Sequence, residues 1–117
     1  MNRSRKGTRA EHKLISLLKA QGYLVIRAAG SGHLTPDLVA LKAGRAIILE
    51  VKSSKQPKVY IRPEQYEVLK RFFEEGFPCY LALYYKGKFL FFPFTSIKKA
   101  KTQFVVSLDD FHQSYLL

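Results

Sequence analysis

The chain has 117 residues, of which 47% are hydrophobic, so it can bury one modest core, and general disorder is excluded. No apolar run approaches the roughly 20 residues of a membrane span, and the basic N-terminus lacks the apolar segment of a secretory signal. Twenty Lys and Arg against nine Asp and Glu give a formal net charge of +11, which favours a polyanionic partner, nucleic acid before an anionic membrane.

The first half of the chain carries one helical pattern and then several strand patterns. Apolar residues recur at helical spacing after residue 8, and the YLVIRA segment is typical of a strand. A turn-rich loop separates this strand from the apolar stretch PDLVALKAGRAIILEVK, which predicts a β-hairpin. The elements predicted here are a helix at 8–21 ended by Gly22, a strand at 23–28, a loop at 29–36 and a hairpin at 36–52 with Ala43-Gly44 at its tip.

The second half repeats the combination of a helix and a hairpin. A proline suits the first position of the helix, and a glycine its end. The elements predicted here are a polar loop at 53–58, an extended piece at 59–61, a helix from Pro63 that Gly76 closes, a hairpin of CYLALYY and KFLFFPF around Lys86-Gly87, and a short helix after Ser107. This order predicts an α/β fold in which helices flank a central mixed sheet of about five strands, in one domain spanning residues 1–117.

Three charges stand in the otherwise apolar first hairpin: Asp37 at its start, and Glu50 and Lys52 near its far end. If Ala43-Gly44 forms a two-residue loop, paired positions sum to 87, and Asp37 lies directly across from Glu50. A four-residue loop keeps this register, whereas a three-residue loop breaks it. Opposed Cβ atoms are about 4.5–5.5 Å apart. Two adjacent anions repel each other, and burial adds to the cost, so the pair predicts a compensating cation.

Mg²⁺ suits this pair, because it prefers oxygen ligands and often uses one or two carboxylates together with water and phosphate. Strand alternation puts Lys52 on the same face as Glu50, where its ammonium is a compact positive charge beside the acidic pair. Val51 points to the opposite face and can pack in a core, while its carbonyl could still serve as a metal ligand.

Glu11 is a further anomaly, because it precedes Leu14 and Leu18 by three and seven positions and therefore shares their apolar face. A glutamate on a core-facing stripe is unusual unless it is paired or metal-bound. Two interpretations stand. Glu11 either lies at the edge of the stripe, reaching solvent or pairing with Arg9 or His12, or it joins the acidic pair of the hairpin in one site.

Asp37, twelve intervening residues and then Glu50-Val51-Lys52, preceded by Pro36, resemble the PD-(D/E)xK nuclease motif. The predicted strands, the glutamate on a preceding helix and the segment RAAGSGHLTPDLVA sharpen that likeness. Together with RKGTRAEHKLISLLKAQGYLVIRAAGS, they make residues 3–85 similar to the archaeal Holliday junction resolvase family. The resemblance implies a restriction-endonuclease-like fold in a single nuclease domain.

The resemblance also implies an activity. Enzymes of this family are homodimers that nick two strands of a four-way DNA junction, using Mg²⁺ or Mn²⁺. Carried over by motif, Asp37 and Glu50 would bind the metal, with Glu11 joining them directly or through water. Lys52 would position the attacking water or stabilise the charge on the phosphorane.

Two further positions follow from the same resemblance. Ser31 matches a serine that contributes to the site in some members, and Arg27 matches a basic position beside it. This sequence has four extra residues, 32–35, before Pro36, where loop length varies. One of them, His33, could act on the leaving group, or it is a bystander or a phosphate contact.

Basic residues around this site predict phosphate contacts. Such contacts position a duplex without reading its bases, which suits a structure-selective enzyme. For any one of them the alternative is a solvated surface residue. The candidate DNA-binding residues are Arg3, Arg5, Lys6 and Arg9 in an N-terminal arm, Arg27, and Lys55, Lys58 and Arg62 after the hairpin.

The second hairpin is apolar on both faces, and the chain holds more phenylalanine than one small core comfortably takes. A symmetric dimer would bury the surplus and would hold two active sites in a fixed relation. The alternative is that all of these residues are core. The phenylalanines in question are Phe72, Phe73, Phe89, Phe91 and Phe92.

Two other functions stay open: another PD-(D/E)xK nuclease acting in repair or restriction, and a basic DNA-binding protein that does not cleave. The intact Asp37, Glu50 and Lys52 argue against the second. Cys79 lies in an apolar run, which favours packing over a role as nucleophile. A single buried thiol fits a reducing cytoplasm, that of a host if the chain is viral.

Overall fold

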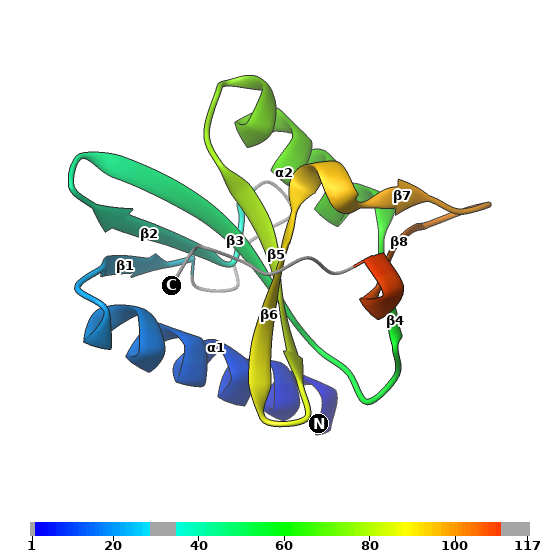
Figure 1. Cartoon of the computed structure of the whole chain (residues 1–117), viewed down its shortest axis with the longest axis horizontal. Coiled ribbons are helices and arrows are strands. Elements are labelled where there is room, and N and C mark those ends of the chain that lie inside the picture. Colours follow the sequence, from blue (N-terminus) through cyan, green and yellow to red (C-terminus); the bar gives the residue numbers. More distant parts are fainter. Residues whose placement is uncertain (1, 29–34, 111–117) are drawn as a thin grey trace.

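A five-stranded mixed sheet forms the centre of the molecule, with α1 (Asn2–Ala20) and α2 (Pro63–Glu74) on opposite sides of it (Figure 1). The computed structural model describes the backbone of residues 2–28 and 35–110, and the side chains of residues 9–28 and 35–109. β3 and β5 pair in parallel, and the other neighbours in this sheet pair antiparallel. In spatial order the strands are β1 (Leu24–Arg27), β2 (Leu38–Lys42), β3 (Arg45–Ser53), β5 (Cys79–Tyr85) and β6 (Lys88–Pro93). The predicted α/β fold is confirmed.

The β2–β3 hairpin closes on the predicted two-residue loop. Ala43 and Gly44 both have positive φ, 53° and 76°, which is the conformation of a type I′ turn. This turn matches the right-handed twist of the flanking strands. Pairs run from Lys42↔Arg45 to Leu38↔Leu49, so the register sum of 87 is confirmed over the whole of β2.

β3 is buried on both faces, because a helix covers each of them. Ile47 and Leu49 point toward α1 and pack in a cluster with Leu14. Ile48, between them, points the other way and packs in a cluster with Leu69 of α2. A central strand paired on both sides therefore reads as an unbroken apolar run, as in parallel sheets generally.

The β5–β6 hairpin is covered on both faces within one chain, contrary to the expectation that one face needs a partner. Phe91, 4% exposed, joins the α1 cluster, and Phe92, 1% exposed, joins the α2 cluster. Phe89 and Phe72 are partly buried against the same two clusters. Phe73 is the exception, with 39% of its surface exposed.

A second, three-stranded sheet was not predicted. It consists of β4 (Lys58–Ile61), β8 (Phe104–Ser107) and β7 (Lys98–Lys99), in that spatial order. Val59, Ile61 and Val106 from this sheet belong to the α2 cluster. The small sheet thus helps to cover the face of the second hairpin that was expected to need a partner chain. Its strands are two to four residues long, and β4 and β8 lie far apart in the chain, so no local period announces the pairing.

Two boundaries also differ from prediction. α1 begins at Asn2 instead of residue 8, because its first turns are polar and carry no apolar period to detect. The proposed N-terminal arm is therefore the start of a helix. The C-terminal helix is a single 3-10 turn, η2 (Leu108–Asp110), and a second such turn, η1 (Phe94–Ser96), follows β6. Within the described ranges, no helix is long and apolar enough to cross a membrane.

Candidate active site

Asp37 and Glu50 interlock where β2 and β3 meet at their open end. The Asp37 N–H donates to Glu50 Oε1 over 2.9 Å, and the Val51 N–H donates to Asp37 Oδ2 over 2.8 Å. The Asp37 carbonyl also accepts a hydrogen bond of 3.0 Å from the Ala28 N–H. Each carboxylate thus accepts a backbone hydrogen bond from the facing strand. These bonds agree with the prediction that Asp37 lies across from Glu50.

Burial makes this pair electrostatically costly. Glu50 is only 4% exposed, and its burial raises its pKa to about 8, with the Asp37 carboxylate contributing in the same direction. Burial also raises the pKa of Asp37; the Val51 N–H opposes that rise, and the charge of Glu11 adds to it. Ionising both carboxyl groups together is therefore unfavourable, and a proton or a cation relieves their repulsion.

Lys52 and Val51 lie on opposite faces of β3, as predicted. The positive charge of Lys52 opposes the rise in the pKa of both Asp37 and Glu50, so its ammonium acts on the acidic pair. Val51 packs against the α1 cluster. One residue step along the strand thus separates a group of the site from a group of the core.

The acidic pair opens into a pocket of about 190 Å³, and the start of α2 forms its far wall. Arg62, which precedes α2, brings a cation to this pocket, and its backbone N–H donates to the Gln65 side-chain oxygen over 3.3 Å. Glu64 brings a further carboxylate. The sequence predicted that the helix starts at Pro63 and that Arg62 lies near the site. It gave no signal that Glu64, Gln65 or Val68 faces Asp37. The pocket is lined by Thr35, Asp37, Glu50, Arg62, Glu64, Gln65 and Val68.

Glu11 binds Arg27, a partner that neither interpretation named. Arg27 Nε lies 2.8 Å from Glu11 Oε1, and 40% and 19% of these two side chains are exposed. Arg27 is paired with Leu38, and the Leu38 side chain packs in the α1 cluster. The Arg27 side chain therefore also lies on the α1 face of the sheet. Asp37 is next to Leu38 in the chain and faces α2. Glu11 therefore reaches the pair electrostatically, raising the pKa of both acids, from the other face.

The donor set fits a hard divalent cation held by two carboxylates. In the described part of the chain, no group of three acidic, His or Cys side chains is placed to hold a metal ion. Two adjacent carboxylates are nevertheless within the range that Mg²⁺ uses, since it keeps several waters and takes phosphate oxygens. Burial, and after it the Asp37 carboxylate, raises the pKa of Glu50 to about 8, and a cation bound between the two carboxylates would oppose that rise.

The other predicted residues scatter around this site. Arg62 lines the acidic pocket, Lys55 lines a different cleft beside α1, and Lys58 is exposed on β4. Arg9 is exposed on α1, whereas the side chains of Arg3, Arg5 and Lys6 lie outside the described ones. Ser31 and His33 lie outside the described residues altogether.

Cys79 is buried, as predicted for a packing residue. Its Sγ lies 3.3 Å from the Phe77 carbonyl and 3.5 Å from the Leu69 carbonyl, to which it donates weakly. Burial raises the pKa of the thiol to about 11, so it is neutral at physiological pH and is a poor nucleophile.

Known proteins are similar to this chain in sequence and in fold. The pattern of the family described as archaeal Holliday junction resolvase (Hjc) matches residues 2–114. The chain belongs to this family. This Hjc-family chain is 42% identical over 88 residues to the crossover junction endodeoxyribonuclease Hjc of Methanocaldococcus jannaschii, over 74% of this chain and 65% of that protein. It is also 42% identical over 78 residues to that of Sulfolobus acidocaldarius, over 62% of this chain and 54% of that protein.

A solved structure extends the likeness to three dimensions. The structure of Archaeoglobus fulgidus Hjc, a Holliday junction resolvase from an archaeal hyperthermophile, matches with a TM-score of 0.80 at 30% identity. That match covers 91% of this Hjc-family chain and 87% of the other. The two curated relatives above are matched over less than two thirds of their own length.

Proposed function

We propose that the chain is a structure-selective endodeoxyribonuclease that nicks four-way DNA junctions symmetrically by metal-dependent phosphodiester hydrolysis. The observation that carries the proposal is the buried Asp37–Glu50 pair, interlocked across β2 and β3 beside Lys52, in a member of the resolvase family. The substrate follows the relatives, which are crossover junction endodeoxyribonucleases.

Asp37 and Glu50 would hold the cation, Mg²⁺ with Mn²⁺ able to substitute, and the Val51 carbonyl is the third candidate ligand. When bound, the cation supplies polarisation of the phosphate and a water of lowered pKa. Lys52, on the same face as Glu50, would stabilise the negative charge that develops on the phosphate or orient the attacking water. The hydrogen bonds from Asp37 N–H and Val51 N–H hold both carboxylates in one orientation, so little reorganisation is needed during the reaction.

Glu11 and Ser31 would complete the site from its edge. Glu11, fixed by Arg27, adds negative potential near the acidic pair and would strengthen its affinity for a cation, directly or through water. Ser31 would contribute from the segment that precedes Asp37 in sequence, as the family resemblance implies.

Phosphate contacts would come from both faces of the central sheet. Arg62 stands on the α2 wall of the acidic pocket, and Arg27 with its exposed guanidinium stands near Glu11. Lys55 and Lys58 follow β3. The first turns of α1 carry Arg3, Arg5, Lys6 and Arg9. None of these charges needs to read a base, which agrees with selection by DNA shape.

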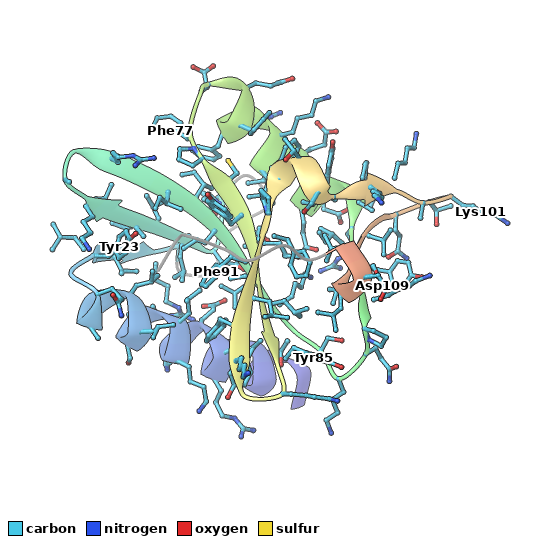
Figure 2. All side chains as sticks on the ribbon, in the orientation of Figure 1. Tyr23, Phe77, Tyr85, Phe91, Lys101 and Asp109 are labelled. Carbon is cyan, nitrogen blue, oxygen red and sulfur yellow. The ribbon has the colours of Figure 1, made fainter. Side chains whose placement is uncertain are left out.

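We further propose that two chains form a symmetric homodimer, because two equivalent nicks need two active sites in a fixed relation. Two exposed apolar residues support an interface at this end of the molecule: Phe73 near the end of α2, 39% exposed, and Phe77 just after it, 41% exposed and labelled in Figure 2. Light scattering should report twice the 13.5 kDa of the chain. If a Phe73→Ser Phe77→Ser variant still has the mass of a dimer, the interface lies elsewhere on the chain.

One assay tests the activity. The protein is incubated with a labelled four-way junction, plain duplex and single strands, each with and without Mg²⁺. Paired symmetric nicks in the junction alone are expected. Equal cutting of plain duplex would indicate a different nuclease of the PD-(D/E)xK superfamily, and tight junction binding without cutting under Mg²⁺ or Mn²⁺ would indicate a DNA-binding protein.

A further inference from the structure

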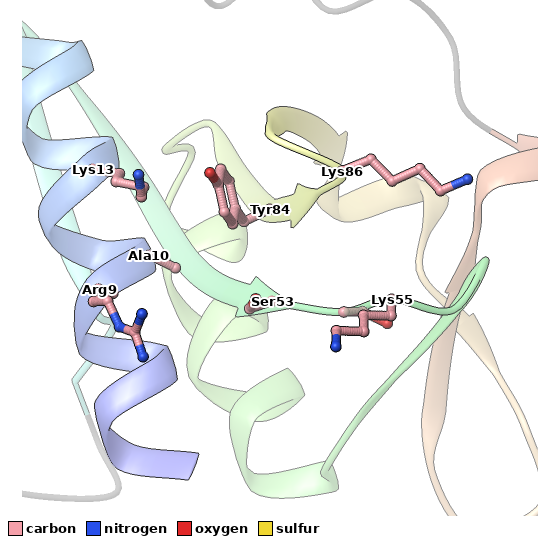
Figure 3. A pocket seen from close by; sticks show the side chains of 8 residues that line it. Arg9, Ala10, Lys13, Ser53, Lys55, Tyr84 and Lys86 are labelled. Carbon is pink, nitrogen blue, oxygen red and sulfur yellow. The ribbon is translucent and has the colours of Figure 1, made fainter. Parts of the chain in front are cut away.

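A cleft of about 560 Å³ lies between α1 and the ends of β3 and β5 (Figure 3). Its volume is in the range of sites that hold one small-molecule-sized group. It shares no lining residue with the acidic pocket, among the described side chains. It is lined by Arg9, Ala10 and Lys13 of α1, by Ser53, Ser54 and Lys55 at and after the end of β3, and by Tyr84 and Lys86 at and after the end of β5.

An aromatic ring forms the floor of this cleft. Tyr84 is paired with Ser53 across the parallel ladder, and the Ser54 N–H donates to the Tyr84 carbonyl over 3.1 Å. The ring of Phe89 lies behind it, 4.8 Å away between centroids at an angle of 43°. Ala10 on the facing helix is too small to fill the space in front. The ring is therefore fixed in position while the cleft in front of it is open to a ligand.

The rim of the cleft is positively charged. Its lining contains four cationic side chains and no acidic one. Lys13 Nζ lies 5.7 Å from the centroid of the Tyr84 ring, and Arg9 extends from the same helix toward the cleft (Figure 3). Lys86 extends away, and its Nζ lies 5.3 Å from the ring of Tyr85. A ligand here would meet a π surface with cations beside it.

We propose that this cleft binds one unstacked nucleotide of the DNA substrate, with the base on Tyr84 and the neighbouring phosphates on Arg9, Lys13 and Lys55. The proposal rests on the junction-cleaving function proposed above and deepens it. A base within a duplex presents only its edges, so an aromatic floor has nothing to stack on there. Nucleotides next to a branch point can leave the stack, because stacking is interrupted at that point.

The position of the cleft links it to the proposed active site. Ser53 directly follows Lys52 and lies three positions along β3 from Glu50, about 10 Å at the usual rise. The cleft opens on the α1 face of the sheet, and the acidic pair faces α2. A nucleotide held at Tyr84 would therefore anchor the branch point at a set distance from the acidic pair. The cleft would make the chain prefer branched DNA over plain duplex, without any contact that reads sequence.

The test compares Tyr84→Leu with Tyr84→Phe, which keeps the ring. Fluorescence anisotropy measures binding of a labelled four-way junction, a duplex and a single strand in EDTA, so that no cleavage occurs. Loss of one base–aromatic stack weakens binding roughly 5- to 150-fold. We expect that loss for Tyr84→Leu with the junction and the single strand, unchanged duplex binding, and wild-type behaviour for Tyr84→Phe.

A second pair of variants tests the rim. Lys13→Ala should weaken junction and single-strand binding and reduce the slope of log affinity against log salt by about 0.7–0.9. Lys101→Ala removes the same charge at the remote tip between β7 and β8 and should leave both unchanged (Figure 2). If circular dichroism shows that Tyr84→Leu does not fold, the comparison of Lys13→Ala with Lys101→Ala tests the proposal. Equal junction binding by these two variants overturns it.

The two proposals fail separately. Wild-type binding of junctions and single strands by a folded Tyr84→Leu variant overturns the cleft, even if junction cleavage persists. Single-strand binding that depends on Tyr84 supports the cleft, even if no junction is ever cut. A free nucleoside monophosphate that displaces the single strand at an equal concentration of bases would assign the cleft to a mononucleotide and overturn the DNA assignment.

Discussion

Replacing Glu50 by Gln should stabilise the metal-free protein while abolishing cleavage. Gln has the same shape, its Oε1 can still accept the Asp37 N–H, and its amide can donate toward the Asp37 carboxylate. The substitution removes a carboxyl group whose ionisation is opposed by burial and by the neighbouring Asp37 carboxylate. Metal-site carboxylates that are held together without their cation strain the fold, and neutralising one of them relieves that strain.

The magnitude follows from the pKa of Glu50, which rises from 4.5 to about 8 on folding. At pH 7 the unfolded chain ionises this group while the folded chain keeps it protonated. A gap of about 2.5 pH units, at ~1.4 kcal/mol per unit, costs the folded state about 3 kcal/mol. Below pH 4.5 the group is protonated in both states and the cost vanishes; above pH 8 the cost levels off at about 5 kcal/mol.

The assay is urea unfolding in EDTA at pH 4.5, 7 and 9, with Glu67→Gln on the exposed side of α2 as the matched control. Relative to the wild type, the free energy of unfolding of Glu50→Gln should increase as pH rises, whereas that of Glu67→Gln should change little. Added Mg²⁺ should stabilise the wild type and narrow its gap to the variant. A gain for Glu50→Gln that is equal at all three pH values, or is absent throughout, would refute the reasoning from burial and charge repulsion.

Three further predictions concern catalysis, DNA binding and the turn. Lys52→Ala should lower single-turnover junction cleavage by on the order of 10²–10³ while anisotropy reports unchanged binding; cutting at the wild-type rate would remove Lys52 from the site. Replacing Arg3, Arg5 and Lys6 together should flatten the salt dependence of junction binding by up to about 2.7 in slope, and an unchanged slope would remove them from the interface. Ala43→Asn should raise the free energy of unfolding by about 1 kcal/mol in urea, because Ala43 has a φ of 53° and Asn tolerates that conformation better; a loss would argue against the type I′ turn.

The central hairpin is the part of the site that local sequence determines best. Strand alternation and a two-residue loop are enough to predict that Asp37 faces Glu50 and that Lys52 shares their face. These rules act over a few residues, and the turn at Ala43-Gly44 sets the register for every pair along β2. The family resemblance came from the same short motif and the helix before it.

Packing between distant segments decided what the sequence left open. Glu11 could be identified as out of place on an apolar stripe, but its partner Arg27 is brought to it by the β1–β2 pairing and the docking of α1. Whether the phenylalanines are buried within one chain likewise depended on the sheet of β4, β8 and β7. Its strands are too short to show a period in the sequence.

The sequence by itself therefore determined the order of the elements that implies the fold class, the family and the geometry of the Asp37–Glu50 pair, because each follows from residue patterns that are local in the chain. Only the tertiary structure decided that the start of α2 walls the acidic pocket and that Tyr84 faces α1 across a basic cleft. Both arrangements join residues dozens of positions apart. Their placement depends on how whole elements pack, and no local pattern of residue types encodes that.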